Sequence, residues 1–172
     1  LVGAVLFDLA LAGRIDTDAD TILVIDDAPT GAAIQDELLA DLSGRGGRCG
    51  VREWVEQAFR QGQALESRAL ALLIERGLIR LETTTRLWVI DERRFPVLNN
   101  RPRQRVKWRL AWAVLTEEIP EVRDIMLVSL ANACGLLSTA LTADQIAARA
   151  ERVDTLSSIE TMSRDVGTAI TA

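Results

Sequence analysis

Residues 125–143 read IMLVSLANACGLLSTALTA, a run of 19 residues without one charged side chain. A run of this length could cross a bilayer as a helix, but four polar side chains interrupt it: Ser129, Asn132, Ser138 and Thr139. We therefore predict a buried helix at the centre of the fold, wrapped by the rest of the chain, and not a membrane span.

Helical patterns flank this run on both sides. Pro102 favours the first turn of a helix. The pattern after it places four apolar residues inward and three arginines, spaced by four, outward: Val106, Leu110, Ala113, Val114 and Arg101, Arg105, Arg109. Beyond the run, Thr142 is a predicted N-cap, and a last helix is predicted around Ile159 to Ile170.

The N-terminal half alternates helices with short strand patterns. The predicted elements are a helix over 1–11 ended by Gly13, two short strands around the aspartates of residues 14–26, a helix over 34–42, a flexible Gly-rich loop over 43–50, helices over 51–60 and 64–76 ended by Gly77, and a hairpin over 78–91 around a Thr-rich turn.

Length and composition bound the architecture. With 172 residues, of which 48% are apolar, the chain has the size of one packed domain, residues 1–172. We predict a mainly α fold, a single helical domain around a buried central helix with short β-hairpins. Because the chain begins with Leu1 and not with Met, we take it to be truncated at its N-terminus; no basic region precedes its first apolar residues, so we expect no signal peptide.

The inventory of side chains excludes several kinds of active site. The chain has no histidine, and its two cysteines, Cys49 and Cys134, are 85 positions apart, which removes most zinc sites and every imidazole-based nucleophile system. Two distant thiols indicate reduced, intracellular cysteines. Asp16, Asp18 and Asp20 are spaced as at the start of an EF-hand loop, but the Gly at its sixth position and the Glu at its twelfth are missing, so we expect no calcium site. A solvated acidic loop explains the second cluster, Glu117, Glu118, Glu121 and Asp124. We expect no enzymatic activity, no metal and no cofactor.

Charge is segregated along the chain. The formal net charge is −5, yet the segment from Arg86 to Arg109 holds eight basic and two acidic residues, a net +6, and leaves −11 for the rest. Three of the four tryptophans, Trp88, Trp108 and Trp112, lie in or beside this segment. Within it, RRFPVLNNRPR places an apolar tetrad, Phe95 to Leu98, at a predicted turn between arginines.

An apolar turn flanked by cations can bury its side chains in lipid while the arginines meet anionic headgroups. The alternative is that Phe95 and Leu98 anchor the hairpin to the core. The predicted membrane-contact residues are Arg93, Arg94, Phe95, Pro96, Val97, Leu98 and Arg101.

Four segments in this order, VGAVLFDLALAGRI (2–15), DDAPTG (26–31), LIERGLI (73–79) and FPVLNN (95–100) before a basic helix, resemble the Golgi phosphoprotein 3 family over the whole chain. The resemblance implies a helical domain with a projecting hydrophobic hairpin, linked to bilayer insertion and self-association. It also implies a peripheral membrane adaptor that recognises phosphatidylinositol 4-phosphate, cytoplasmic and, in eukaryotic relatives, at the Golgi. With 19 arginines to one lysine, typical of a GC-rich genome, we expect a prokaryotic homologue.

The family's phosphate-binding residues are replaced in this sequence. Eukaryotic members use a tryptophan before the first helix, an arginine early in it, and two arginines on the helix that ends in the ERG-like cap. The tryptophan position lies upstream of Leu1, and the arginine positions hold Val2, Gln63 and Glu66. The candidates for a displaced anion site, by their place in the same region, are Arg14, Arg60 and Arg68.

A winged-helix nucleic-acid binder is the main alternative. Residues 71–91, ALLIERGLIRLETTTRLWVID, have the form of a helix that ends in glycine followed by a wing hairpin, and the arginines after it could follow phosphates. The preceding helix offers few side chains that read bases, and the rest of the chain is acidic, so we favour the lipid surface.

Overall fold

The computed structural model describes residues 1–17, 21–60, 62–86 and 90–158, and describes the backbone alone for residues 57–60, 84–86 and 90–92. The helices are α1 Val2–Leu11, α2 Ala33–Gly44, α3 Val51–Arg60, α4 Gly62–Glu75, α5 Arg101–Leu115, α6 Val122–Ala133 and α7 Ala143–Ala148, with the 3₁₀ turn η1 over Leu137–Thr139. The strands are β1 Ile15–Thr17, β2 Thr21–Val24, β3 Arg48–Gly50, β4 Glu82–Arg86 and β5 Ile90–Arg94. Residues 150–158 are also helical. The prediction of a mainly α fold is confirmed.

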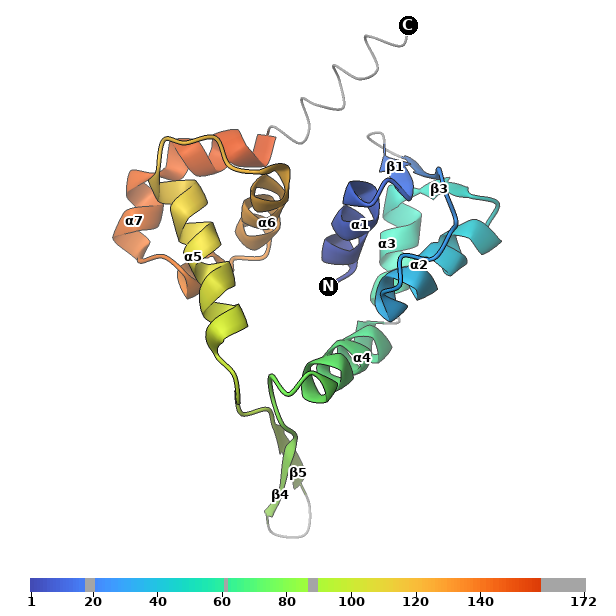
Figure 1. Cartoon of the computed structure of the whole chain (residues 1–172), viewed down its shortest axis with the longest axis horizontal. Coiled ribbons are helices and arrows are strands. Elements are labelled where there is room, and N and C mark those ends of the chain that lie inside the picture. Colours follow the sequence, from blue (N-terminus) through green and yellow to red (C-terminus); the bar gives the residue numbers. More distant parts are fainter. Residues whose placement is uncertain (18–20, 61, 87–89, 159–172) are drawn as a thin grey trace, which may run out of the picture.

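The first lobe contains α1, α2, α3 and a three-stranded antiparallel sheet in the order β1-β2-β3 (Figure 1). Strand β2 alternates, so that Ile22 is buried while Leu23 is exposed, as expected for a strand with one face on a core. Leu9 of α1, Leu39 of α2 and Trp54 of α3 belong with Ile22 to one hydrophobic core. This lobe is therefore built from residues that precede α4.

The second lobe contains α5, α6, η1, α7 and residues 150–158, packed around Val114 and Val128 (Figure 1). Two arginines beyond α7 hold the C-terminal end of α5. Arg152 donates from Nε to the carbonyl of Ala113 at 2.9 Å and from Nη2 to that of Glu118 at 2.5 Å. Arg149 donates from Nη2 to the carbonyl of Leu115 at 3.0 Å. These side chains satisfy backbone acceptors that the helix end leaves without partners.

Helix α6 of the second lobe joins the two lobes, because it contacts both α5 of its own lobe and α1 of the first lobe. The approach to α1 is close, because a Cβ added at Gly3 would stand 3.0 Å from Cδ2 of Leu130. Arg123 of α6 forms an ion pair with Asp8 of α1, and Gln35 of α2 donates to the same carboxylate at 3.3 Å. The predicted central helix is therefore α6.

Helix α4 and the two-stranded sheet β4-β5 connect the lobes, and the sheet projects away from both (Figure 1). Gly77 ends the helical segment with a φ of +65°, a left-handed conformation that glycine adopts without strain. The predicted stop at Gly77 is confirmed. The antiparallel register runs from Glu82 opposite Arg94 to Arg86 opposite Ile90, and residues 87–89 between them lie outside the described part of the chain.

Two predictions of turns or loops were wrong. The threonines at 83–85 lie in strand β4, because β-branched residues favour extended backbone, so the Thr-rich turn does not exist there. The Gly-rich segment 43–50 includes strand β3, in which Cys49 pairs with Ile22. The glycines locally favour a loop, but hydrogen bonding of residues 48–50 to β2 makes this segment a strand.

Two helix predictions also need correction. The run 125–143 is not one helix, because α6 ends at Ala133, Gly135 takes a φ of +66° and η1 follows. Val106, predicted to point inward, is exposed, because the core reaches α5 only from Leu110 onward. At Thr142 the predicted N-cap is confirmed, with Gln145 completing a capping box. The predicted last helix, Ile159 to Ile170, lies outside the described residues.

Candidate functional site

The base of the projecting sheet, residues 78–81 and 95–99, is fastened by backbone hydrogen bonds. Arg80 N donates to Pro96 O at 3.1 Å, and Leu98 N donates to Leu78 O at 2.9 Å. Ile79 and Val97 form an antiparallel bridge between these bonds. The hairpin base is thus a continuation of the β4-β5 ladder toward α4 and α5.

The apolar tetrad Phe95 to Leu98 lies in this hairpin base and not in a turn, which corrects the sequence interpretation. Its last two residues, Val97 and Leu98, are 45% and 56% exposed, while Phe95 and Pro96 are half-buried. The first half of the tetrad is thus partly covered by the fold, and the second half faces outward; contact of these side chains with lipid stays a prediction.

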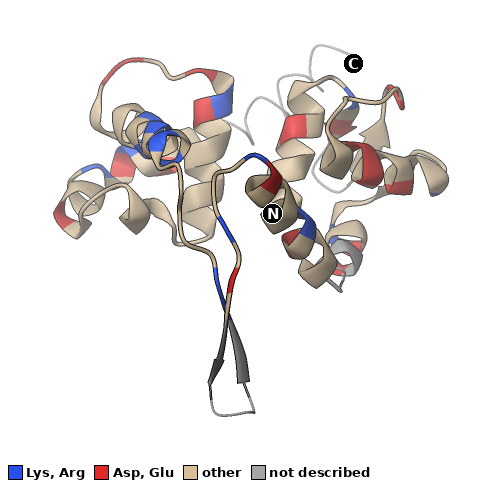
Figure 2. Cartoon of the chain, turned by 60° about the horizontal axis from the view of Figure 1, so that its bottom comes forward, with Lys and Arg blue, Asp and Glu red and all other residues tan. Residues whose placement is uncertain are grey.

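Arginines surround the hairpin base (Figure 2). Arg93, Arg94 and Arg101 are all exposed, and within the described residues no ion pair engages Arg93 or Arg101. Arg80 forms an ion pair with Glu82. The predicted membrane-contact residues are therefore brought together in one region of the molecule, at the point where it narrows.

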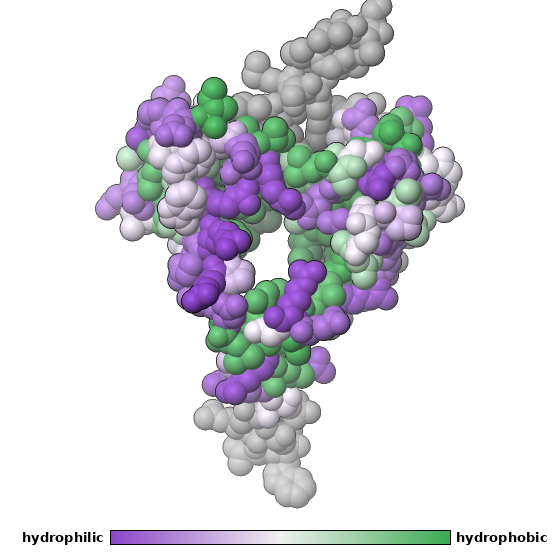
Figure 3. Space-filling model, viewed as in Figure 1, coloured by the Kyte–Doolittle hydropathy of each residue, from purple (hydrophilic) through white to green (hydrophobic). Residues whose placement is uncertain are grey.

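Further apolar side chains adjoin this region. Leu81, 49% exposed, continues the hairpin base, and Leu73 and Ile74 are partly exposed near the end of α4. Figure 3 shows these elements as an apolar area between the lobes and the hairpin. Leu81 is a further exposed apolar residue that the predicted membrane-contact set lacks, although it precedes β4 directly and its spacing of two from Ile79 is a signal of the same strand face.

Helix α5 follows the hairpin base and carries the densest positive charge. It contains five basic and no acidic residues. Residues 101–108 include no buried side chain, and Trp108 is 64% exposed. The Trp108 ring stacks on that of Trp112, with centroids 6.3 Å apart and an interplanar angle of 23°.

Farther along α5, a cation is used inside the fold. Arg109 places Nε 2.7 Å from Oδ1 of Asp124, whose side chain is buried, and Nη2 3.8 Å from Glu121. Of the outward arginines predicted from the spacing of four, Arg101 and Arg105 are exposed, whereas Arg109 is an internal ion-pair partner.

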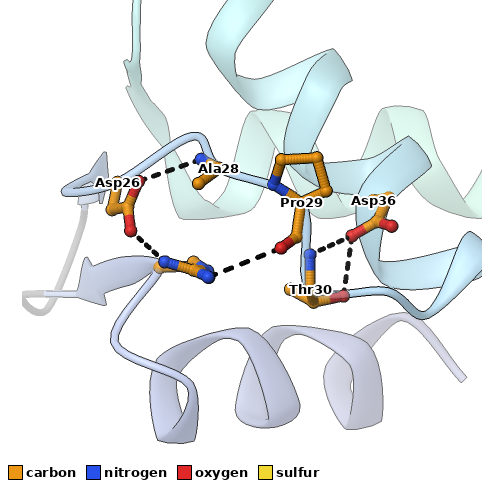
Figure 4. Close-up of polar contacts among 6 residues, drawn as sticks. Asp26, Ala28, Pro29, Thr30 and Asp36 are labelled. Carbon is orange, nitrogen blue, oxygen red and sulfur yellow. Dashed lines mark hydrogen bonds and ion pairs between the residues drawn. The ribbon is translucent and has the colours of Figure 1, made fainter.

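The predicted anion-site residue Arg14 is engaged by its own chain. Its guanidinium pairs with Asp26, and Nη2 lies 3.5 Å from the carbonyl of Pro29. Figure 4 shows how this loop is held: the Asp26 carboxylate accepts from Ala28 N, and Asp36 accepts from both the amide and the hydroxyl of Thr30. Arg14 therefore orders the loop 26–31 by an internal ion pair.

Of the other two candidates, the structure describes the side chain of one, Arg68. Arg68 on α4 forms an ion pair with Glu37 on α2, and the side chain of Arg60 lies outside the described residues. Gln63 and Glu66 on α4 are exposed. Any phosphate bound at Arg14 or Arg68 would have to displace a carboxylate of the chain itself.

Several titratable groups of the first lobe have shifted pKa values. Hydrogen bonds from Thr30 lower the pKa of the Asp36 carboxyl, and the hydrogen bond from Arg45 lowers that of Asp41, which also accepts from Trp54 at 2.9 Å. Burial raises the pKa of the Cys49 thiol. Each of these shifts has its cause in a contact or in burial within the fold of the first lobe.

The described residues hold no group of three or more potential metal ligands. Among the helices described, none is long and apolar enough to cross a membrane. Both cysteines, Cys49 and Cys134, are free thiols.

Comparison with known proteins gives one positive finding. The family model described as Golgi phosphoprotein 3 (GPP34) matches residues 1–172, the whole chain. No curated protein matches the sequence.

Proposed function

Since the chain belongs to the Golgi phosphoprotein 3 family of membrane-associated, adaptor-type proteins, we propose that it binds anionic membrane surfaces without enzymatic activity. The contact is made by the hairpin base together with Arg93, Arg94 and Arg101. The protein cargo of such an adaptor would bind elsewhere on the molecule.

The observation that carries the proposal is the exposure of Val97 and Leu98 beside arginines in a chain of net charge −5. In water, exposed apolar side chains gain nothing, but each contributes about 1.5–3 kcal/mol when fully buried. Each nearby arginine contributes about 1 kcal/mol at an anionic surface. Two apolar and two or three cationic side chains are sufficient for reversible membrane binding.

We further propose that recognition follows surface charge more than headgroup identity. The positions that hold phosphate in eukaryotic members carry Val2, Gln63 and Glu66 here, so the bidentate guanidinium donors of a specific phosphate site are missing. Vesicles with phosphatidylinositol 4-phosphate and vesicles with phosphatidylserine, matched in surface charge, should therefore bind the protein to a similar extent.

Co-sedimentation with phosphatidylcholine vesicles that contain phosphatidylserine tests the proposal. The variant Val97→Asp/Leu98→Asp should lose about tenfold or more in partitioning, since two apolar contacts become two like charges at an anionic surface. The matched control is Ile25→Asp/Ile119→Asp, which changes two exposed apolar residues away from the hairpin and should lose much less.

Two results would contradict the proposal. One is equal loss in the hairpin variant and in the control, because then only net charge matters. The other is salt-dependent binding of the wild type to duplex DNA without any binding to vesicles, which would favour the winged-helix alternative. Self-association through the hairpin stays a prediction, which sedimentation velocity of wild type and hairpin variant tests.

A further inference from the structure

The N-terminal half of α5 has an outer face that core packing does not explain. Arg101, Arg105 and Trp108 follow one another at spacings of four and three, so they share one side of the helix; Trp112, one turn farther on, already packs against the second core. The buried residues of α5, Leu110, Ala113 and Val114, lie on the other side. A mostly exposed tryptophan therefore stands among arginines on the side away from the core.

The first two turns of this helix are poorly stabilised by the rest of the protein. Residues 101–108 bury no side chain, and a free helix of this length is marginal in water. The first turn contains no acidic residue, and its arginines lie at the positive end of the helix dipole, which is unfavourable. Asn100, the N-cap, makes no side-chain capping hydrogen bond; the side chain of Asn99 accepts one from Arg101 N at 3.1 Å. An anionic surface would place negative charge beside the positive end of the helix dipole and beside the arginines of the first turn. It would thereby remove the unfavourable interaction between them.

We propose that this outer face, Arg101, Arg105 and Trp108, lies on the anionic bilayer, so that the protein rests on the side of α5 as well as on its hairpin base. The inference rests on the proposed function and adds the orientation of the molecule. Over the seven residues from Arg101 to Trp108 the helix rises about 10 Å. A molecule that stood on the hairpin alone would hold Trp108 away from the lipid.

The chemistry of the face selects a bilayer as its occupant. Tryptophan is enriched at the membrane–water interface, where its ring and its N–H are both accommodated. Basic residues interleaved with an aromatic ring on a helix are typical of helices that lie in the headgroup region. The face is also continuous with the proposed contact, because Leu98 and Arg101 are separated only by Asn99 and Asn100.

Two measurements on the full chain test the orientation, with vesicles of phosphatidylcholine and phosphatidylserine. In the first, brominated lipid quenches tryptophan emission, and the difference between wild type and Trp108→Phe isolates Trp108. We expect the wild type to show a quenched component that Trp108→Phe lacks. In the second, Arg105→Gln should weaken partitioning about fivefold, and Arg105→Gln/Trp108→Ala should weaken it further.

The matched control for the second measurement is Arg52→Gln/Ile119→Ala, which removes one exposed arginine and one exposed apolar side chain from elsewhere. The proposed orientation is wrong if Trp108 is not quenched and its replacement does not weaken partitioning. The proposed function stands in that case, provided that the wild type binds vesicles and the hairpin variant binds them more weakly. If the wild type binds no vesicles, both are wrong. Unchanged melting temperatures exclude unfolding of the variants as the cause.

Discussion

The two halves of α5 differ in how much side chain they bury and in how much positive charge they carry. Its C-terminal half buries Leu110, Ala113 and Val114, and Arg149 and Arg152 satisfy carbonyl groups at its end. Residues 101–108 bury nothing and carry four of the five basic residues of the helix. One continuous helix thus has a C-terminal half that packs in the hydrophobic core and an N-terminal half that stays at the surface.

This difference indicates that the residues for stability and the residues for the proposed membrane binding lie in different halves of α5. A substitution in the C-terminal half should change folding, and one in the N-terminal half should change binding. The predictions below test this separation, beginning with the largest expected effect on the free energy of unfolding.

Val114→Asp and Trp108→Asp place the same carboxylate at two positions of one helix that are six residues apart. Val114 is fully buried, so an unpaired charge there should cost more than about 3 kcal/mol of unfolding free energy. Trp108→Asp should cost about 1 kcal/mol, mainly the lost stacking on Trp112. Urea unfolding measures both, and equal losses would break the separation between the halves.

Arg109→Met should be the next largest effect. The residue lies at the boundary between the halves, and its removal leaves the buried carboxylate of Asp124 without its cation. We expect a loss of about 2–3 kcal/mol. The double variant Arg109→Met/Asp124→Leu should recover part of it, since no charge then stays buried; a double variant as unstable as the sum of both single ones would show that the pair is not coupled.

Arg152→Met tests the tertiary cap of α5. The substitution leaves the carbonyl groups of Ala113 and Glu118 without their side-chain donor, at a cost of about 1–2 kcal/mol. Hydrogen exchange should increase near residues 113–118 and stay unchanged at residues 101–105. Faster exchange over the whole helix would mean that the two halves open together.

Acid should destabilise the loop that Asp36 holds in the first lobe. The pKa of Asp36 is lowered by hydrogen bonds from Thr30, so its ionised form is favoured in the folded state. Its contribution is present above the unfolded pKa of about 3.9 and is lost as the pH falls toward the lower folded value. Asp36→Asn should flatten the decline of the melting temperature in this range. An identical decline would exclude Asp36 as a cause.

Several helix ends could be predicted from residues adjacent in the sequence. The stops at Gly13 and Gly77 and the cap at Thr142 depend on the backbone of a few adjacent residues, and each was predictable. Strand β3 and the place of Thr83 in β4 were missed because they depend on pairing with residues far away in the sequence or across the hairpin.

The site was predictable in composition but not in geometry. The sequence placed Val97 and Leu98 among arginines, and the structure keeps them exposed there. It gave no means of knowing that Phe95 is half-buried, or that Arg14 and Arg68 meet the carboxylates of Asp26 and Glu37. Such partners come from other elements, which only the assembled fold brings near.

The first hydrophobic core ends at Trp54 and the second begins at Leu110, and this has a consequence for biosynthesis. Once residues up to about the end of α3 have left the ribosome, every member of the first core has been made, so that lobe can fold before α5 is translated. The second core then assembles from the last third of the nascent chain against an α1 already in place. Each core needs only nearby stretches of polypeptide, a topology that favours rapid folding in the order of synthesis.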